Sequence, residues 1–535
     1  MRILVTETLG QAGLDMLSSC CQVEVVKNPT PERLLEIIPA YEALVVRSNT
    51  KVTVDVLEAG KRLKVVGRAG TGVDNIDLDA ATKRGIFVVN APTGNSNAVA
   101  EHTIALMLTL ARRIYPAVDS LKQGRWEKSA LQGQEVLGKT LGLIGLGRIG
   151  SLVASKAKGL DMRVVAHDPY ASPERAASSG VELVSLETLL AEADFISVHT
   201  PLTPQTRGLV DGAKLALLKP TAYIINCARG GIIDEVALEE ALREGRLAGA
   251  ALDVFEHEPA THHPLVGLPN VIATPHVGAS TNEAQENVAT DVAQSVVDVL
   301  EGRMPSSPVN VPYLPPQAAS FLAPYIDLAQ RLGSFFVQWR GEIADSVELI
   351  YDGELCEHDT QVLTSAFLAG LLTPAYSEPV NIVNVHRLAS DRGLVVSEMR
   401  RGQSRQLGNL ITARYPNGDR DRNISGTLIQ GRPHLVALDS QRLDCVLQGN
   451  MLLDLHHDRP GIVGRMGLIL GERGINISFV QMSRAHRGGP SIMILGLDDP
   501  ADEAIMERVT EVPNVQRARM VNLTPLPGYQ DPPID

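Results

Sequence analysis

The sequence predicts an α/β protein with two consecutive parallel-sheet units, followed by an α+β region and a small closing domain. Short apolar runs alternate with helical stretches through the first 310 residues, a pattern typical of parallel strands joined by crossover helices. A glycine-rich turn, GLGRIG, separates one such run from the helix that follows it. The chain closes on a predicted strand–helix–strand–strand–helix–strand order, which is the ferredoxin-like βαββαβ pattern.

The size and composition of the chain limit its class. At 535 residues the chain is long enough for several domains, and 44% apolar and 21% charged residues are typical of globular proteins. The formal net charge is −13 without a basic cluster, which argues against a nucleic-acid partner. Five scattered cysteines fit neither a disulfide framework nor a zinc site. With no signal peptide and no apolar run near the ~18 residues of a membrane span, we expect a cytoplasmic protein with no membrane partner and no metal.

The first predicted unit contains the strand-like runs RILVTE, VEVV, ALVVRS, LKVVGRAG and IFVVNAP. A helical segment at about 98–111 follows, apolar on almost all sides and therefore expected to be buried. The amphipathic segment 283–300 could return to pack on the first unit. We therefore predict a discontinuous first domain, residues 1–96 and 284–310, around a second domain at residues 97–283.

The second predicted unit carries a nucleotide-binding turn. The motif GLGRIG follows the apolar run 140–144, and the next predicted strand ends in Asp168. Gly145 permits a tight turn, Gly147 lets backbone N–H groups approach a pyrophosphate, and Gly150 lets the helix pack close to its strand.

The surroundings of this turn favour NAD. The helix N-terminus offers unpaired N–H groups to the pyrophosphate. Asp168 can accept hydrogen bonds from the ribose hydroxyls and would repel a 2′-phosphate. A bare GxGxxG can be a mere turn, but here both flanking strands and the acid are in register, so we predict a Rossmann-type NAD domain.

Three later motifs place polar side chains at predicted strand ends, where α/β folds build their sites. Arg229 lies in NCARGG, Glu258 in DVFEHEP and His276 in TPHVGAS. Each alone is more often a surface charge or a structural histidine. Together they suit oxidation of a 2-hydroxy acid: a guanidinium binds the carboxylate, an imidazole takes the hydroxyl proton, and a carboxylate orients that base.

GLGRIG and these three motifs together resemble the D-isomer-specific 2-hydroxyacid dehydrogenases over about the first 310 residues. The resemblance implies that Arg229, Glu258 and His276 are the catalytic residues. It also implies a set of NAD contacts: Thr71, Arg148, Ile149, Asp168, Thr200, Cys227, Ala228 and Asp253.

The segments VVRSNTKVT and VGRAGTGVDNID resemble the phosphoglycerate-oxidising members of this family. They imply NAD-dependent oxidation of 3-phospho-D-glycerate to 3-phosphohydroxypyruvate, the first step of phosphorylated serine biosynthesis. A substrate with two anionic groups needs arginines on an acidic protein, and Arg47 and Arg68 each follow a predicted strand. With Ser48 and Gly70 they form the predicted substrate site, although both arginines could instead face solvent.

Two other functions stay open on the sequence alone. One is a glyoxylate or hydroxypyruvate reductase of the same family, which would not need Arg47 and Arg68. The other is a non-catalytic protein that binds NAD as a sensor. The set of Arg229, Glu258 and His276 argues against that second alternative.

The Pro-rich stretch 304–316 predicts a domain boundary. Residues 317–449 resemble by position the intervening domain of long family members, an allosteric substrate-binding-like domain. Residues 450–535 resemble an ACT regulatory domain through HHDRPG and GIN.

The ACT resemblance implies a serine effector held by His456, Asp458 and Asn476. Asp458 stands where serine-sensitive members often have Asn, so a dimerisation module without an effector remains an alternative. We expect a homo-oligomer, a dimer or a homotetramer, because the apolar helix at 98–111 and the ACT module both need partners to cover them.

Overall fold

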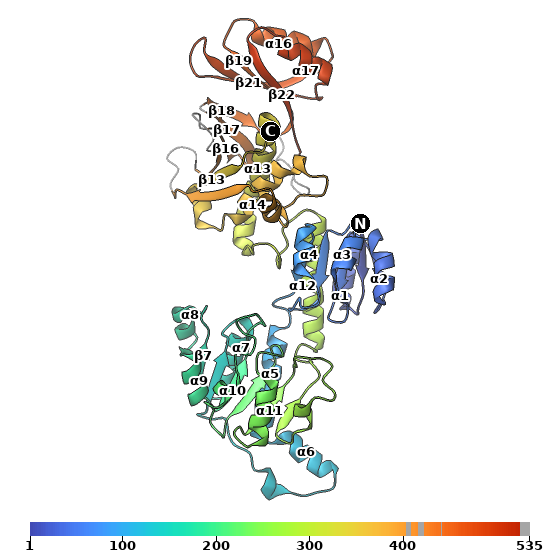
Figure 1. Ribbon diagram of the computed structural model, residues 1–535, viewed down its shortest axis with the longest axis vertical. Helices are drawn as coiled ribbons and strands as arrows, with labels where there is room; N and C mark the ends of the chain where they lie inside the picture. The colour runs from blue at the N-terminus through green and yellow to red at the C-terminus, as the bar shows by residue number, and fades with distance from the viewer. Residues whose placement is uncertain (403–407, 416–421, 440, 525–535) are drawn as a thin grey trace. The chain divides into compact units, whose positions relative to one another are not determined.

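The computed structural model describes residues 1–402, 408–415, 422–439 and 441–524 (Figure 1). The chain divides into two compact units. Unit 1 comprises Met1–Thr8, Gly13–Asn90 and Val292–Asp535, and unit 2 comprises Leu9–Ala12 and Ala91–Asp291.

Unit 1 begins with a five-stranded parallel sheet in the order β2-β1-β3-β4-β5. Its strands are β1 (Arg2–Val5), β2 (Gln22–Val25), β3 (Ala43–Val46), β4 (Val65–Arg68) and β5 (Phe87–Asn90). The helices between them are α1 (Gln11–Cys20), α2 (Pro31–Ile37), α3 (Val54–Ala59) and α4 (Leu78–Lys83). All four residues of β3 are buried, as expected for a parallel strand covered on both faces.

The chain returns to this sheet after unit 2. Helix α12 (Asn282–Leu300) packs Val292 and Val296 onto β4, where a Cβ at Gly67 would lie within 3.0 Å of both valine side chains. Asn90 of β5 then donates its backbone N–H to Ser307. The first sheet is therefore completed by residues more than 200 positions away.

Unit 2 contains a seven-stranded parallel sheet in the order β12-β11-β10-β9-β6-β7-β8. Its strands are β6 (Thr140–Ile144), β7 (Arg163–His167), β8 (Glu182–Leu183), β9 (Phe195–Val198), β10 (Tyr223–Asn226), β11 (Gly249–Leu252) and β12 (Val271–Ala273). Its helices are α5 (Ser96–Ala111), α6 (Ile114–Lys122), α7 (Arg148–Lys158), α8 (Pro173–Ser178), α9 (Leu186–Glu192), α10 (Gly212–Leu215) and α11 (Glu235–Arg243).

Helix α5 buries one face within its own unit. Val99, Leu106, Met107 and Leu110 belong to the same core as residues of β6, β7 and α7. Ala105 is exposed, and Ile104 and Leu108 are only half-buried. That a second copy of the chain covers this remaining surface stays a prediction.

The region after the Pro-rich stretch is α+β. Two helices, α13 (Pro316–Arg340) and α14 (Gln361–Leu372), pack against a mixed six-stranded sheet in the order β14-β13-β15-β16-β17-β18. The strands are β13 (Ser346–Asp352), β14 (Val395–Arg400), β15 (Leu410–Tyr415), β16 (Arg422–Ile429), β17 (Arg432–Leu438) and β18 (Gln441–Val446), with the short helix α15 (Val385–Asp391) before β14. Every residue of α14 after Gln361 is buried.

The C-terminal part of the described chain is a four-stranded antiparallel sheet in the order β20-β21-β19-β22. Its elements are β19 (Gly449–His457), α16 (Ile462–Gly471), β20 (Ile477–Arg484), β21 (Pro490–Leu497), α17 (Glu503–Thr510) and β22 (Val515–Leu523). This is the expected βαββαβ order, and the predicted fold class is confirmed. Among the described residues, no helix combines the length and apolarity needed to cross a membrane.

Candidate active site

The three predicted catalytic residues follow three neighbouring strands of unit 2. Arg229 follows β10, Glu258 follows β11 and His276 follows β12. These strands are parallel and in register, with Asn226 opposite Leu252 and Leu252 opposite Ala273. All three side chains therefore come from the carboxyl edge of one sheet, where α/β proteins place their ligands.

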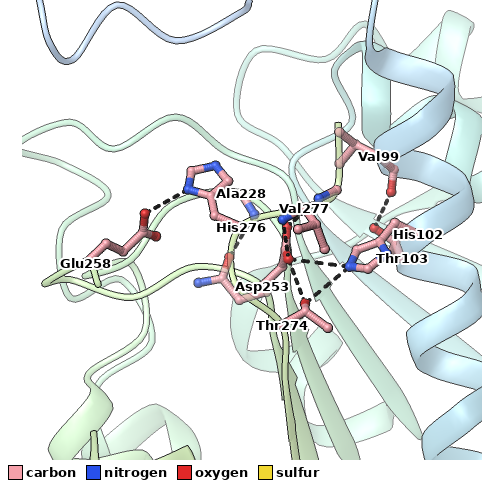
Figure 2. Close-up of polar contacts among 11 residues, drawn as sticks. Val99, His102, Thr103, Ala228, Asp253, Glu258, Thr274, His276 and Val277 are labelled. Atoms are coloured by element: carbon pink, nitrogen blue, oxygen red, sulfur yellow. Dashed lines mark hydrogen bonds and ion pairs between the residues drawn. The ribbon is translucent and has the colours of Figure 1, made fainter. Parts of the chain in front are cut away.

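His276 and Glu258 form a direct pair, which Figure 2 shows at the sheet edge. The imidazole Nδ1 lies 2.9 Å from Glu258 Oε2, and Glu258 Oε1 accepts the Phe255 backbone N–H at 3.2 Å. The side chains are 50% and 38% exposed, so a ligand can reach them. The carboxylate is held by the backbone and in turn orients the ring.

The backbone at His276 lies in the left-handed region, with φ of 55°. This region costs a residue with a Cβ about 1 to 3 kcal/mol and persists only where the surroundings impose it. Asp253 provides that constraint, because its carboxylate accepts the backbone N–H groups of Val277 at 2.9 Å and Gly278 at 2.8 Å. These two hydrogen bonds fix the loop that carries the His276 imidazole.

Arg229 sits in a loop that is braced on both sides. Asn226, which is buried, accepts the Ala228 N–H at 3.0 Å and donates to the Arg229 carbonyl at 2.9 Å. The next residue, Gly230, lies against the Phe255 backbone so closely that a Cβ there would collide with the carbonyl carbon and oxygen. The loops after β10 and β11 are therefore in backbone contact.

The glycine turn fits a dinucleotide. Gly145 has φ of 99°, and a Cβ at Gly150 would collide with the Gly145 carbonyl oxygen. A Cβ at Gly147 would meet nothing within 4 Å. Helix α7 begins at Arg148 and points its N-terminus at this open position. The cradle matches the role assigned to each glycine, and the α7 N-terminus, which includes Ile149, favours an anion.

Two predicted NAD contacts also suit the cofactor. Asp168 follows β7, and its carboxylate accepts the N–H groups of Leu146 at 2.8 Å and Tyr170 at 2.9 Å, which fixes it beside the glycine turn. The Thr200 hydroxyl is buried and has no hydrogen-bond partner among the described residues. An orphaned polar atom next to the cradle fits a ligand that supplies the missing partner.

Cys227 and Asp253 are more enclosed than the other predicted NAD contacts. Burial raises the pKa of the Cys227 thiol to about 12, so the side chain is protonated and no nucleophile. Asp253 is 2% exposed, and its carboxylate oxygens accept hydrogen bonds from Thr274, Val277 and Gly278. Direct NAD contact by either residue stays a prediction.

The predicted substrate residues lie at the carboxyl edge of the first sheet in unit 1. Glu7 accepts the backbone N–H groups of Arg47 at 2.9 Å, Asn49 at 3.2 Å and Thr50 at 3.0 Å. Asn75 donates to the Arg47 and Thr50 carbonyls at 2.7 Å. The loop that contains Arg47 and Ser48 is therefore rigidly held.

Arg68 ends β4, directly beside β3, with Val46 opposite it in the sheet. Its guanidinium lies over Gly70, whose φ is 153°, and occupies the space that any side chain at position 70 would need. Arg47 and Arg68 thus come from the ends of adjacent strands. Thr71 belongs to the same loop, and its carbonyl accepts a hydrogen bond from the Asn90 amide.

The predicted effector residues differ in exposure. His456 is 1% exposed and bonds to Asp454 inside the domain. Asp458 accepts from Arg484 Nη1 at 2.8 Å and from the Gly488 N–H at 3.2 Å, and the pKa of its carboxyl is lowered chiefly by Arg484. Asn476 donates to Asp498 at 2.8 Å.

Several residues that brace these loops were not predicted from the sequence. Glu7 and His102 lie outside the catalytic and nucleotide-binding motifs, and each acts on a segment far away in the chain. Asn226 and Thr274 stand inside the NCARGG and TPHVGAS motifs, and Thr274 donates to Asp253 at 2.6 Å. Their place in these motifs was the available signal.

Comparison with known proteins agrees with this arrangement. Family models match for the D-isomer specific 2-hydroxyacid dehydrogenase NAD binding domain at residues 104–278, the D-3-phosphoglycerate dehydrogenase intervening domain at 321–439 and the ACT domain at 450–514. A D-3-phosphoglycerate dehydrogenase of Methanocaldococcus jannaschii is 44% identical over 98% of this chain and 100% of the relative. The one of Bacillus subtilis is 40% identical over 98% and 99%.

Solved structures match a little over half of the chain. The TT0316 protein of Thermus thermophilus is 40% identical, with a TM-score of 0.54, over 58% of this chain and 100% of that one. A D-lactate dehydrogenase of Aquifex aeolicus in complex with NAD and lactic acid is 29% identical, with a TM-score of 0.52, over 56% and 96%. The chain therefore belongs to the D-3-phosphoglycerate dehydrogenase family within the D-isomer-specific 2-hydroxyacid dehydrogenases.

Proposed function

We propose that the protein interconverts 3-phospho-D-glycerate and 3-phosphohydroxypyruvate with NAD. The observation that carries the proposal is the His276–Glu258 pair at the carboxyl edge of the NAD-binding sheet, in a chain alike over its full length to D-3-phosphoglycerate dehydrogenases. When bound, NAD accepts the hydride from C2 of the hydroxy acid. The chain's own residues bind the acid and move the proton.

In this reaction His276 is the base. Its Nδ1 faces Glu258 at 2.9 Å, so the N–H hydrogen lies on that side and Nε2 holds the free lone pair in the neutral ring. Nε2 takes the C2 hydroxyl proton, and Glu258 stabilises the resulting imidazolium. In the reverse direction the imidazolium returns the proton to the oxygen.

Arg229 binds the substrate carboxylate and polarises the C2 oxygen. A planar guanidinium offers two parallel N–H donors to a carboxylate, which fixes the orientation of C2. Bracing of its loop by Asn226 and by the contact at Gly230 fixes the backbone from which the guanidinium extends. Arg47 and Arg68 neutralise the phosphate, and Ser48 and Gly70 shape that subsite.

We further propose that serine acts on the C-terminal domain through His456, Asp458 and Asn476. Arg484 offsets the charge of Asp458, so this carboxylate does not present an uncompensated negative charge to the carboxylate of an amino acid.

A homo-oligomer and a cytoplasmic location complete the proposal. The five cysteines are free thiols, as is usual in a reducing compartment, and cell fractionation tests that location.

The test is NADH oxidation with phosphohydroxypyruvate, hydroxypyruvate and glyoxylate, each with and without serine. We expect phosphohydroxypyruvate to be preferred and serine to slow turnover. Arg47→Gln and Arg68→Gln should each raise KM about tenfold or more for the phosphorylated acid only, since each loses a charged hydrogen bond. Arg84→Gln is the matched control, because it alters a half-buried arginine before β5 whose guanidinium donates to the Glu58 carbonyl at 3.0 Å.

The same assay separates the alternatives. Equal activity on unphosphorylated acids, unchanged by either arginine variant, would identify a hydroxypyruvate or glyoxylate reductase. NADH binding without reduction of any 2-keto acid would identify an NAD-sensing protein. His276→Ala should lower kcat by about 10²- to 10⁴-fold while NADH affinity, measured by fluorescence, stays nearly unchanged.

A further inference from the structure

His102 joins helix α5 to the loop that carries His276 (Figure 2). Its Nε2 lies 3.5 Å from Asp253 Oδ1 and 3.3 Å from the Thr274 hydroxyl. The His102 side chain is 21% exposed, whereas that of Asp253 is 2% exposed. The His102 imidazole therefore covers the buried Asp253 carboxylate on the side that faces helix α5.

The hydrogen on His102 can be placed by counting donors. Thr274 has one hydroxyl hydrogen and donates it to Asp253 Oδ1 at 2.6 Å. The Thr274 oxygen and the Asp253 carboxylate are then both acceptors toward His102. Nε2 must carry a hydrogen shared between them, whether or not Nδ1 is also protonated. The contact thus persists in the neutral and the charged ring.

Asp253 depends on this set of donors. Burial alone would raise its pKa, but hydrogen bonds from His102, Thr274, Val277 and Gly278 hold the pKa below its usual value. On the β10 side the neighbouring group is the Cys227 thiol, which burial keeps protonated and uncharged. Asp253 therefore remains an ionised acceptor, and His102 is its only titratable donor among the described residues.

The carboxylate transmits this constraint to the catalytic loop. Asp253 accepts the N–H groups of Val277 and Gly278, directly after the left-handed His276. A Cβ at Gly278 would lie 3.0 Å from Asp253 Oδ2 and 3.6 Å from His102 Cδ2. The loop is therefore packed onto the carboxylate and the imidazole of His102 together.

We propose that His102 is a positioning residue for His276, acting through Asp253 and the backbone N–H groups of Val277 and Gly278. His102 itself contacts neither the 2-hydroxy acid substrate nor the His276 side chain. By holding Asp253 in place it fixes the left-handed backbone that aims the His276 ring at Glu258. The effect on turnover rests on the proposed function, in which His276 moves the proton; the effect on the loop does not.

The test compares His102→Leu, which fills similar space without a donor, with His102→Gln, whose amide can donate at a similar reach. We expect His102→Leu to lower kcat by about tenfold to a hundredfold, because a small misplacement of a catalytic group has effects of that size. KM and NADH affinity should change by less than about threefold. His102→Gln should recover most of kcat.

His434→Leu is the matched control. His434 lies on β17 in unit 1, whereas Asp253 belongs to unit 2. Its side chain is 14% exposed and also pairs with a carboxylate, Asp444, at 2.8 Å. This variant should keep kcat, so a loss seen only at His102 is not a general effect of removing a partly buried histidine.

A second readout does not depend on turnover. Amide hydrogen exchange in peptides spanning residues 274–280 should accelerate in His102→Leu and return to the wild-type rate in His102→Gln. If the leucine variant does not fold, His102→Ala serves the same comparison without added bulk. Wild-type hydrogen exchange and wild-type kcat in His102→Leu would overturn the proposal. An equal loss of kcat in His102→Leu and His102→Gln would also overturn it.

The two proposals fail in different ways. If the wild-type protein reduces no 2-keto acid, the proposed function is wrong. Amide hydrogen exchange at residues 274–280 then still tests whether His102 holds the loop. If the wild-type protein is active but His102→Leu leaves exchange unchanged, only the positioning role falls.

Discussion

A histidine whose ring Nδ1 is buried lies next to the glycine turn. His199 follows β9, its Nε2 lies 2.9 Å from the Ser197 hydroxyl, and its backbone carbonyl blocks the space beside Gly145. Burial lowers its pKa to about 4. The ring is therefore neutral in the folded protein at physiological pH, and it supports the turn by packing rather than by charge.

This burial predicts a pH-dependent stability. An exposed histidine in the unfolded chain binds a proton near pH 6.5, whereas His199 in the folded chain does so only near pH 4. Unfolding between these values takes up a proton, so the stabilisation is complete above pH 6.5 and is lost as the pH falls toward 4. We expect a loss of roughly 1 kcal/mol between pH 7.5 and 5.5.

Urea denaturation of the wild-type protein and of His199→Gln at these two pH values checks this expectation. The glutamine cannot titrate, so the pH dependence of the variant should be shallower by that amount. His386, whose pKa burial also lowers, is present in both proteins and cancels in the comparison. Equal slopes in the two proteins would contradict the assignment to His199.

Single residues differ in how far the sequence could identify them. Arg229, Glu258 and His276 were predictable because each polar side chain follows an apolar strand within a short motif. Glu7 was not, because it acts on backbone N–H groups about 40 positions away. His102 was not, because its partner Thr274 is 172 positions away in the chain.

The loops after β10 and β11 work as one element. Gly230 lies against the backbone of Phe255, and the two loops carry Arg229 and Glu258. A Cβ at position 230 would overlap the Phe255 carbonyl group, and neither backbone can yield without moving its strand end. The glycine is therefore required by close approach rather than by an unusual dihedral angle.

We expect Gly230→Ala to lower kcat/KM by at least about a hundredfold, because the Arg229 loop must shift, and to lower the melting temperature. Steady-state kinetics and thermal unfolding measure the two effects. Gly267→Ala is the control, since a Cβ at Gly267 meets nothing within 4 Å. Wild-type activity in Gly230→Ala would show that the two loops are not coupled.

Helix α13 shows where local sequence signals mislead. The interior Pro324 indicates a break rather than a 25-residue helix. The structure nevertheless forms the helix, because Leu322, Leu328, Leu332 and Phe335 all enter the core of the sheet behind it. Burial of several large apolar side chains outweighs one interior proline, which costs about 3 kcal/mol.

Several apolar side chains in and directly after α6 are left exposed by the fold of the chain. Ile114, Val118 and Leu121 share one face of α6 by their spacing, and Trp126 beyond the helix is 83% exposed. An apolar face of this kind marks an interaction surface in a globular protein. It supports the proposed homo-oligomer, with this segment as one contact.

We expect Leu121→Asp to shift the protein toward smaller species in size-exclusion chromatography with light scattering, because a charge in an apolar interface is costly. Leu217→Asp, which changes a partly exposed leucine of the same unit outside this face, should leave the mass unchanged. A wild-type mass equal to one chain would contradict the proposed oligomer.

Local patterns in the sequence determined the fold class, the NAD-binding turn and the family, because strand and helix periodicity and short glycine motifs are encoded by neighbouring residues. Tertiary structure alone decided that His276 adopts a left-handed backbone, pairs with Glu258 and rests on Asp253 and His102. Those contacts depend on strand order and on helix packing across the sheet. Residues far apart in the chain meet only once the sheet has formed, and no local periodicity records which of them will meet.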